Sequence, residues 1–348
     1  MKKFLSVLAL FLLIVQGGFA QKKYSAYGVA FYNQENLFDT CHDAGKNDYD
    51  FLPGGSYRWN SMKYTHKLHN MARAIADLGT DVLPGVGCAV IGLSEVENSK
   101  VLDALVAQPE LAARGYKYCH VEGPDKRGID CALLYNPALF SVRDVKLVPY
   151  VYDLEKDKDR ATRGFLTVSG TMAGEHLTVV VCHWPSRGAS SHYREIAGTQ
   201  VKAVKDSLLR DDPKCKVMVM GDMNDDPTNK SMTDCLGCKP EVDKVGPGNM
   251  YNPWYNILAK EGRGTLSYGG SWNLFDQIVM TPNMLNQKGK KDFSSLKFWK
   301  NHIFTRPYLL QTEGKYKGNP KRTTAGGVWL DGFSDHLPVV VYLLKEQK

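Results

Sequence analysis

The sequence has only one long apolar run, from Phe4 to Val15, and this run is too short to span a membrane comfortably. It follows Lys2 and Lys3 and leads into small residues up to Ala20, a pattern typical of a secretory signal peptide. No cysteine follows the run, so it offers no site for a lipid anchor. We therefore expect residues 1–20 to be a signal peptide. We also expect an exported product, periplasmic or extracellular, with no stable membrane insertion once the signal is removed.

A zinc-binding cysteine pattern is also absent. Cys235 and Cys238 form a lone C-x-x-C pair, without a second pair or a histidine at zinc spacing. Eight cysteines in an exported protein could form disulfides, so this pair is either a local disulfide or two free thiols. Cys131, Cys182 and Cys215 lie in or beside apolar runs, where a small buried thiol is the commoner explanation.

The sequence shows no arginine-rich stretch and no aromatic-interleaved basic stripe of the kind that follows a nucleic-acid backbone. The formal net charge is +7, which allows an anionic partner without demonstrating one. A late group of lysines predicts a solvated loop: Lys288, Lys290, Lys291, Lys297 and Lys300.

Short apolar runs alternate with helical periods along the chain. Helical spacing of apolar residues predicts one amphipathic helix from Tyr64 to Leu78 and another from Ala197 to Leu208. Several strands follow one another without a helix between them, so we expect mixed rather than purely parallel sheets. No internal repeat or linker is evident, and we expect residues 21–348 to form a single domain. The strand candidates are Tyr27–Tyr32, Cys88–Leu93, Ile129–Tyr135, Phe165–Ser169, Leu177–Cys182, Val217–Met220, Leu274–Met280 and Leu337–Leu344.

Polar motifs lie consistently at the ends of these apolar runs. In a mixed sheet, the carboxyl ends of some strands lie beside the amino ends of antiparallel neighbours, so these motifs could share one rim. Each motif alone has an ordinary explanation: Gly-Asp-x-Asn is typical of a turn, and Ser-Asp-His of a strand start. The residues concerned are Asn33, Glu95, His183 and Asp222 after strands, and Asp276 and Asp335-His336 at strand starts.

Such a rim suits metal-assisted attack on a phosphoester. Glu95, with Glu35 and Asp335, could supply hard oxygen ligands, which favour Mg²⁺, Mn²⁺ or Ca²⁺ over zinc. Asp222 and Asn224 could orient the attacking water, because alternate residues of an extended segment face the same side.

Histidines and further donors complete the predicted chemistry. His336 paired with Asp276 would form a carboxylate–imidazole unit. His183, Asn33 and Arg187 could donate hydrogen bonds to the phosphoryl oxygens as charge builds there.

The order of these motifs resembles that of the endonuclease/exonuclease/phosphatase superfamily, which has the DNase I-like fold. The resemblance covers most of the chain, from Asn33 to His336. The matching pieces are Tyr32-Asn33-Gln-Glu35-Asn-Leu-Phe38, Gly92-Leu-Ser-Glu95, Cys182-His183-Trp-Pro-Ser-Arg187, Gly221-Asp222-Met-Asn224, Leu274-Phe-Asp276-Gln and Ser334-Asp335-His336.

The resemblance implies a four-layer α/β sandwich, with two mixed β-sheets packed face to face and flanked by helices. It also implies metal-dependent phosphoester hydrolysis, with Glu95 as the principal metal ligand and Asn33 as a neighbour of the metal or the phosphate. Arg160, Arg163 and Arg187 are similar to basic positions of secreted bacterial members and are phosphate ligands or surface ion-pair partners. We expect a monomer.

One departure concerns the substrate. Gln277 follows Asp276, where nucleases usually carry an aromatic residue. Trp184, Trp272 and Tyr268 are either substrate contacts or core aromatics. A phosphodiesterase or nuclease is the first expectation for function. The alternatives are a sphingomyelinase-like enzyme, a sugar- or inositol-phosphate phosphatase, and a secreted binding module that has lost catalysis.

Overall fold

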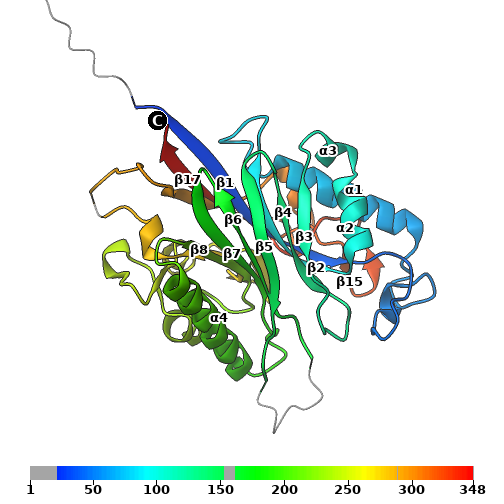
Figure 1. The fold of residues 1–348 in the computed structure, drawn as a ribbon. Coiled ribbons are helices and arrows are strands. Elements are labelled where there is room, and N and C mark those ends of the chain that lie inside the picture. Colours follow the sequence, from blue (N-terminus) through cyan, green and yellow to red (C-terminus); the bar gives the residue numbers. More distant parts are fainter. Residues whose placement is uncertain (1–21, 153–160, 288, 348) are drawn as a thin grey trace, which may run out of the picture.

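The computed structural model describes residues 22–152, 161–287 and 289–347. The predicted signal peptide and Arg160 lie outside the described residues. Two large sheets pack face to face, with α1, α2 and α3 on one side and α4 on the other (Figure 1). The chain therefore has the predicted four-layer α/β sandwich.

The first sheet has six strands in the order β14-β17-β1-β2-β4-β3. Only β1 and β2 are parallel, and the other neighbours are antiparallel. Its strands are β1 (Tyr24–Leu37), β2 (Cys88–Val96), β3 (Lys117–His120), β4 (Asp130–Tyr135), β14 (Lys297–Ile303) and β17 (Val339–Glu346).

The second sheet has seven strands in the order β5-β6-β7-β8-β13-β10-β9. Its central pair, β7 and β8, is again parallel. Its strands are β5 (Phe140–Val148), β6 (Phe165–Met172), β7 (Glu175–His183), β8 (Lys216–Asp222), β9 (Cys238–Lys239), β10 (Met250–Tyr251) and β13 (Asp276–Met280). Two small ribbons pair β11 (Leu266–Tyr268) with β12 (Ser271–Asn273), and β15 (Thr324–Ala325) with β16 (Val328–Trp329).

A long helix connects the central parallel pair of each sheet, because parallel neighbours need a crossover connection. The short strands β9 and β10 are also parallel and are connected by a loop with one 3₁₀ turn. Helix α1 (Ser61–Asp77) connects β1 to β2, and α4 (Ser191–Asp211) connects β7 to β8. Asn60 caps α1 by accepting a hydrogen bond from the backbone N–H of Lys63. The shorter helices are α2 (Ser99–Val106), α3 (Pro109–Ala112), α5 (Tyr255–Glu261), one π-helical turn at Ser231–Cys235 and 3₁₀ turns at Tyr49–Phe51, Val242–Lys244, Pro282–Met284 and Pro307–Leu309.

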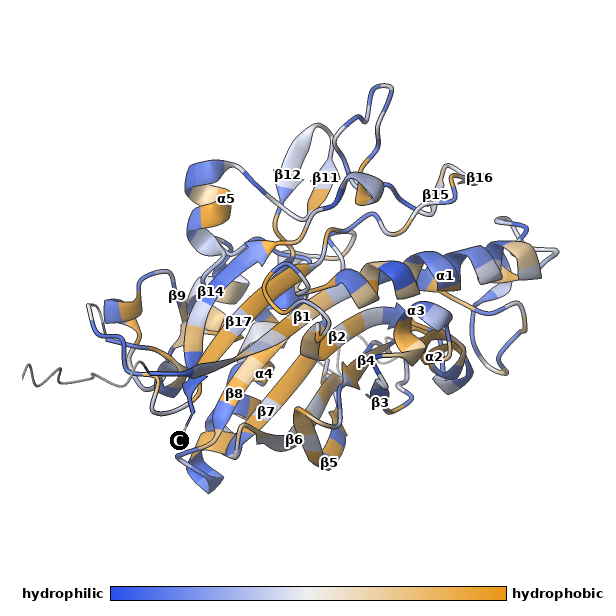
Figure 2. Cartoon of the chain, turned by 90° about the horizontal axis from the view of Figure 1, so that it is seen from above, coloured by the Kyte–Doolittle hydropathy of each residue, from blue (hydrophilic) through white to orange (hydrophobic). Residues whose placement is uncertain are grey.

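One large hydrophobic core contains residues of both sheets and of α1. The apolar colouring of the central strands in Figure 2 follows this interior. The sheets approach closely at Gly92 of β2, where a Cβ atom would lie 2.5 Å from the Sδ atom of Met220 in β8. A second core packs α4 against the outer face of the second sheet.

The structure changes one sequence interpretation, that of the lysines, and decides between the two alternatives left open for the cysteines. Lys297 and Lys300 lie in the edge strand β14 rather than in a loop, which fits the use of lysine to protect sheet edges from pairing. All eight cysteines are free thiols, including Cys235 and Cys238. Among the described residues, no helix has the length and apolar character needed to cross a membrane.

Candidate active site

Strand direction brings the predicted polar motifs to one rim. His183 ends β7 and pairs in register with Asp222 at the end of the parallel strand β8. Strand β13 runs antiparallel to β8, so its first residue, Asp276, pairs with Asp222. The distant segments thus place two carboxylates and an imidazole beside one another.

The first sheet contributes the other side of this rim. Phe31 of β1 pairs with Val339 of the antiparallel strand β17, which places the residues before β17 near the carboxyl end of β1. The hydroxyl of Ser334 donates to the carbonyl of Asn33 at 2.8 Å and accepts from the backbone N–H of His336 at 3.1 Å. These bonds fix His336 close to Asn33.

Several site residues lie where the backbone departs from regular strand geometry. The pairing register of the first sheet shifts at two places, between Asn33 and Leu37 of β1 and around Glu95 of β2. Each shift marks a β-bulge. Glu95 has φ 60°, and Asn224 after β8 has φ 48°, both in the left-handed region that non-glycine residues rarely adopt. Such conformations gather at functional sites, where the surrounding structure holds them in place.

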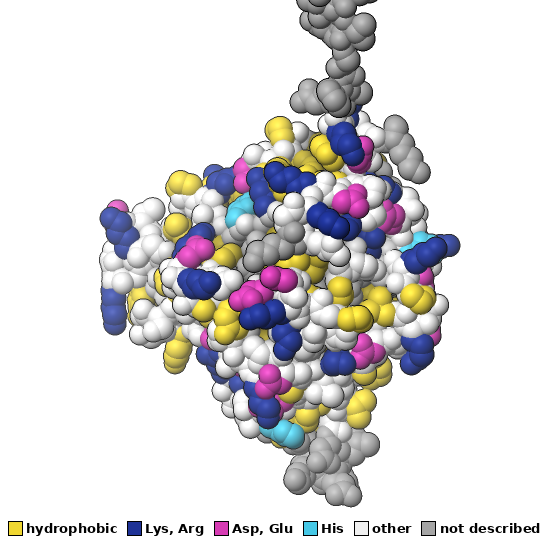
Figure 3. All heavy atoms as spheres, turned by 90° about the vertical axis from the view of Figure 1, so that its left-hand side faces the viewer, with side chains coloured by type: hydrophobic (Ala, Val, Ile, Leu, Met, Phe, Trp, Pro, Cys, Tyr) yellow, Lys and Arg dark blue, Asp and Glu magenta, His cyan; other side chains and the backbone are white. Residues whose placement is uncertain are grey.

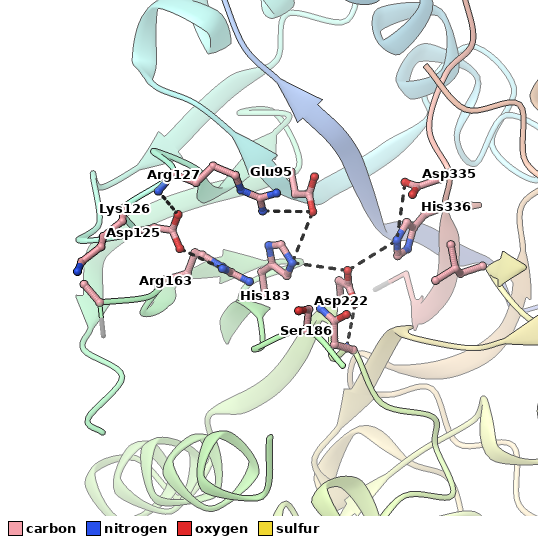
Figure 4. Close-up of a pocket in the computed structure, with 13 residues that line it drawn as sticks. Glu95, Asp125, Lys126, Arg127, Arg163, His183, Ser186, Asp222, Asp335 and His336 are labelled. Carbon is pink, nitrogen blue, oxygen red and sulfur yellow. Dashed lines mark hydrogen bonds and ion pairs between the residues drawn. The ribbon is translucent and has the colours of Figure 1, made fainter. Parts of the chain in front are cut away.

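A cavity of about 490 Å³ opens at this rim (Figure 4). Seven predicted site residues line it: Glu95, Arg163, His183, Asp222, Asn224, Asp335 and His336. Figure 4 shows a continuous chain of polar contacts running from Glu95 through His183 and Asp222 to His336.

Asp222 is the centre of this chain. Its Oδ2 atom accepts a hydrogen bond from Nδ2 of Asn33 at 3.0 Å and lies 3.7 Å from Nε2 of His183 and 3.8 Å from Nε2 of His336. Its Oδ1 atom accepts from the backbone N–H of Asn224 at 2.9 Å. Burial raises the pKa of Asp222 to about 7, although the nearby His336 lowers it.

His336 and Asp276 form the predicted carboxylate–imidazole pair. Nδ1 of His336 lies 2.7 Å from Oδ2 of Asp276, whose side chain is fully buried. Burial by itself lowers the pKa of His336, but Asp276 and Asp222 outweigh it and raise that pKa well above its usual value. The ring therefore carries a positive charge at neutral pH.

His183 has the opposite protonation behaviour. Burial holds its pKa well below the usual value, and the nearby Arg163 and Arg127 lower it further. His183 is therefore neutral at neutral pH, although its Nε2 atom lies 3.7 Å from carboxylate oxygens of both Glu95 and Asp222.

Three cationic side chains line the wall of the cavity beside His183, and sequence reasoning found only one of them. Asp125 holds Arg163 through a 3.0 Å hydrogen bond from NH1 to its Oδ2 atom, while its Oδ1 atom accepts from the backbone N–H of Arg127 at 2.9 Å. Lys126 and Arg127 follow in the same loop. This loop precedes β4 and has no strand-end motif, so only its charge could have pointed to it.

Two further carboxylates face each other across an arginine that the sequence analysis missed. Arg322 donates from Nε to Oε1 of Glu35 at 3.2 Å and from NH2 to Oδ2 of Asp335 at 2.9 Å. Glu35 also accepts from the backbone N–H of Thr323 at 2.6 Å, so both its oxygens are engaged, and it does not line the cavity. We therefore leave Glu35 out of the proposed ligand set.

The cavity offers hard oxygen donors for a divalent cation. Oε1 of Glu95 and Oδ1 of Asp335 accept no hydrogen bond from the described residues. Among those residues, no cluster of three or more acidic, histidine or cysteine side chains could hold a metal alone. Mg²⁺ suits such a site, because it keeps several waters and needs only one or two carboxylates.

The structure places Arg187 outside the cavity, against the expectation of a phosphate contact. Its guanidinium donates to Oδ2 of Asp226 at 2.8 Å, to Oδ1 of Asn273 at 3.0 Å and to the carbonyl of Asn224 at 3.2 Å. It also lies over the ring of Phe275. Arg187 thus stabilises the loop after β8, and few of its N–H groups are left to bind a ligand.

Asn33 and Asp276 also lie behind the cavity wall and not in it. Each holds a residue that does face the cavity, Asp222 and His336 respectively. Gln277 is fully buried and donates to the carbonyl of Asp225 at 2.9 Å, so it supports the same loop.

The fold agrees with comparison to known proteins. The model of the Endonuclease/Exonuclease/phosphatase family matches residues 28–345. The chain belongs to this family. It is therefore a member of a family of phosphoester hydrolases, as the order of its motifs indicated. A search of curated protein sequences found no match.

Several solved structures share the fold at low sequence identity. Mannosyl-6-phosphatase Bt3783 of Bacteroides thetaiotaomicron is 17% identical, with 91% of this chain and 99% of that chain covered at a TM-score of 0.54. TDP2 of D. rerio, in complex with a single-strand DNA product, is 14% identical, with 92% and 99% covered at 0.53. ANGEL2, a 2',3'-cyclic phosphatase, is 14% identical, with 94% and 99% covered at 0.55.

Proposed function

We propose that the protein is a divalent-metal-dependent phosphoester hydrolase that acts by water attack on phosphorus. The observation that carries this proposal is the position of Asp222. One of its oxygens lies within 3.8 Å of two imidazoles and an amide, on the wall of a cavity that Glu95 also lines. A carboxylate in such a setting can accept the proton of a water molecule.

The described residues divide the chemistry among them. As the oxygen of water bonds to phosphorus and the ester P–O bond breaks, Asp222 takes the water proton. Charged His336, held by Asp276, and Arg163, held by Asp125, stabilise the growing negative charge on the phosphoryl oxygens. The leaving alkoxide takes a proton from solvent.

Glu95 is the proposed principal ligand of the metal ion, with Asp335 as a second carboxylate. When bound, Mg²⁺, or Mn²⁺ or Ca²⁺ in its place, would neutralise phosphoryl charge and polarise the attacking water. Both carboxylates have the hard oxygen atoms that these ions prefer.

The test is hydrolysis of bis(p-nitrophenyl) phosphate by the purified protein with Mg²⁺ or Mn²⁺. We expect Asp222→Asn and His336→Ala each to lower kcat/KM by about 10²–10⁴-fold, the usual contribution of general acid–base groups, while the circular dichroism spectrum is unchanged. Asp212→Asn is the matched control, because Asp212 forms an exposed pair with His176 at 2.8 Å. Absence of turnover by the wild type would instead support a binding module without catalysis.

The proposed substrate is a phosphodiester, and nucleic acid is the first candidate. The complex of TDP2 with single-strand DNA shows that a protein with this fold can hold such a ligand. Sugar phosphates are the second candidate, because mannosyl-6-phosphatase Bt3783 also has the fold. Export remains a proposal that rests on residues 1–20 alone.

A further inference from the structure

A second cavity, of about 500 Å³, adjoins the first. Leu266 and Asp335 line both cavities, so the two are neighbours across these residues. The β11–β12 ribbon forms one wall of the second cavity, and the segment 311–322 forms the other. A phosphoester whose phosphorus lies beside Asp222 can therefore extend one substituent into the second cavity.

Backbone hydrogen bonds hold both walls in place. Leu266 forms a β-bridge with His336, and the N–H of Leu337 donates to the carbonyl of Thr265 at 2.8 Å. In the other wall, Gln311 and Asn319 close the neck of the segment, with the N–H of Gln311 donating to the carbonyl of Asn319 at 2.8 Å. The side chains at the tips of the two walls are therefore not needed to hold the walls in place.

Two of those side chains are exposed tyrosines. Tyr268 at the end of β11 is 81% exposed, and Tyr316 is 61% exposed. Both line the second cavity, and neither hydroxyl has a hydrogen-bond partner among the described residues. Trp184, in contrast, is fully buried in the core of the second sheet. The substrate-contact interpretation therefore fits Tyr268, whereas Trp184 is a core aromatic.

Lysines lie on both sides of Tyr316 in the chain. Lys315 lies 5.6 Å from the centre of the Tyr316 ring, and Lys317 and Lys321 follow closely in the chain. None of these lysines forms an ion pair with the described residues, and Glu313 is the single acidic residue of the segment 311–322. One exposed aromatic ring, that of Tyr316, therefore lies between basic residues of the same segment.

We propose that the second cavity and the segment 311–322 bind single-stranded nucleic acid next to the scissile phosphate. Bases stack on Tyr268 and Tyr316, and the neighbouring phosphates meet Lys315, Lys317 and Lys321. Aromatic platforms combined with a positively charged path are the usual means of binding single strands. This inference rests on the proposed hydrolysis, for which it specifies the substrate.

The chemistry of the walls favours this ligand over two others. A neutral sugar would gain nothing from three unpaired lysines. A lipid would need an apolar surface beside the cavity, whereas the segment 311–322 that forms one wall carries these lysines. A base inside a duplex is stacked on its neighbours and cannot stack on Tyr268 or Tyr316, so a single strand is the expected substrate.

The first experiment compares a short single-stranded DNA oligonucleotide with bis(p-nitrophenyl) phosphate, which is too small to fill both cavities. In Tyr268→Ala and Tyr316→Ala, we expect the ratio of the two kcat/KM values to fall at least about fivefold per tyrosine, because base–aromatic stacking has that order of strength. Tyr49→Ala is the control, since Tyr49 is 59% exposed and lines neither cavity.

The second experiment measures the salt dependence of oligonucleotide binding in the Asp222→Asn background, where turnover is suppressed. Lys315→Gln and Lys317→Gln together should reduce the slope of log Kd against log salt concentration by about 0.7 per lysine. Lys290→Gln with Lys291→Gln is the matched control, because these neighbouring lysines are exposed and lie outside both cavities and outside the segment 311–322 that forms the wall of the second.

The outcomes separate this inference from the proposed hydrolysis. If the wild type does not hydrolyse bis(p-nitrophenyl) phosphate, the proposed function is wrong. If it does, but the tyrosine variants keep the wild-type ratio or mannose 6-phosphate is a better substrate than the oligonucleotide, the nucleic-acid subsite alone is wrong. A duplex cleaved as fast as the single strand would also contradict it.

Discussion

Two histidines contact one carboxylate oxygen and differ in charge. Oδ2 of Asp222 lies 3.7 Å from His183 and 3.8 Å from His336. Burial and Arg163 lower the pKa of His183 and keep this ring neutral, whereas Asp276 and Asp222 raise the pKa of His336 and keep it charged. The site thus holds one neutral and one cationic imidazole at the same pH, and residue type alone could not have distinguished them.

Glu95→Gln should weaken metal dependence more than any other carboxylate change in the cavity. The amide removes the negative charge, while its oxygen can still accept the hydrogen bond from the backbone N–H of Asn36. We expect the metal concentration for half-maximal activity to rise at least about tenfold. Full activity at the wild-type metal concentration would show that Glu95 is no ligand. Glu97→Gln, two residues along, is the control.

Glu97 should make stability depend on pH. It is buried, and this burial raises its pKa to about 8, although its hydrogen bond from the backbone N–H of Asp39 opposes the shift. The folded state therefore keeps a proton that the unfolded state releases above about pH 4.5. The stabilising contribution of this proton is full below that pH and is lost as the pH rises through about 8.

Glu97→Gln should remove this dependence, because the amide resembles the protonated carboxyl group. Thermal unfolding of the variant and the wild type should give similar Tm values near pH 4.5 and a higher Tm for the variant near pH 9. Equal Tm values at both pH values would mean that Glu97 is ionised in the folded protein throughout.

The sequence predicted the site residues that follow or open a regular strand. Asp222, His183 and His336 belong to this group, because their place relative to an apolar run is visible in the sequence. Arg127 and Arg322 could not be found in this way. Each lies in a loop, and its contact with Glu95 or Glu35 depends on tertiary packing of distant segments.

At the scale of elements, the parallel pair β7–β8 sets the spacing of the site. Gly221 of β8 pairs with Cys182 of β7, one residue before Asp222 and His183. A Cβ atom at Gly221 would lie 2.1 Å from the carbonyl oxygen of Cys182, which no real Cβ contact tolerates. The close pairing of these strands therefore depends on this glycine.

Gly221→Ala should force β7 and β8 apart and impair both folding and catalysis. Overpacking of this kind typically lowers the free energy of unfolding by about 1–3 kcal/mol, which urea denaturation would measure. Gly248→Ala is the control, because nothing lies within 4 Å of a Cβ atom there. Wild-type stability of Gly221→Ala would show that the two strands can separate without cost.

Among the strands missed from the sequence are the edge strands β3, β5 and β14. β3 has only four residues, and β14 carries lysines at the edge of its sheet. Edge strands pair on one side only, so their composition resembles that of a loop. The bulges at Glu35 and Glu95 could not be predicted either, because bulge positions depend on the register of two paired strands.

At the scale of the whole molecule, the two sheets share one interior. Each is built around a parallel pair with a crossover helix, yet the largest hydrophobic core includes residues of both sheets. The charged residues on the face drawn in Figure 3 alternate between basic and acidic, without a continuous basic stripe. The site lies where the rims of the two sheets meet.

The shared core supports the proposal that residues 21–348 form one domain. Neither sheet could keep its apolar face buried without the other, so we expect both to unfold together. Tryptophan fluorescence and far-ultraviolet circular dichroism should report coincident denaturant transitions. Two separated transitions would indicate that each sheet, with its own helices, is an independent unit.

Backbone hydrogen bonds hold segment 311–322, and this affects which substitutions the segment can accept during evolution. Its neck closes without help from the side chains at its tip, whereas the groups around Asp222 are held by side chains of both sheets. Substitutions at the tip can therefore accumulate without disturbing the chemistry. Substrate recognition can therefore change during evolution while the hydrolytic groups stay the same, as expected where variable loops are attached to a rigid scaffold.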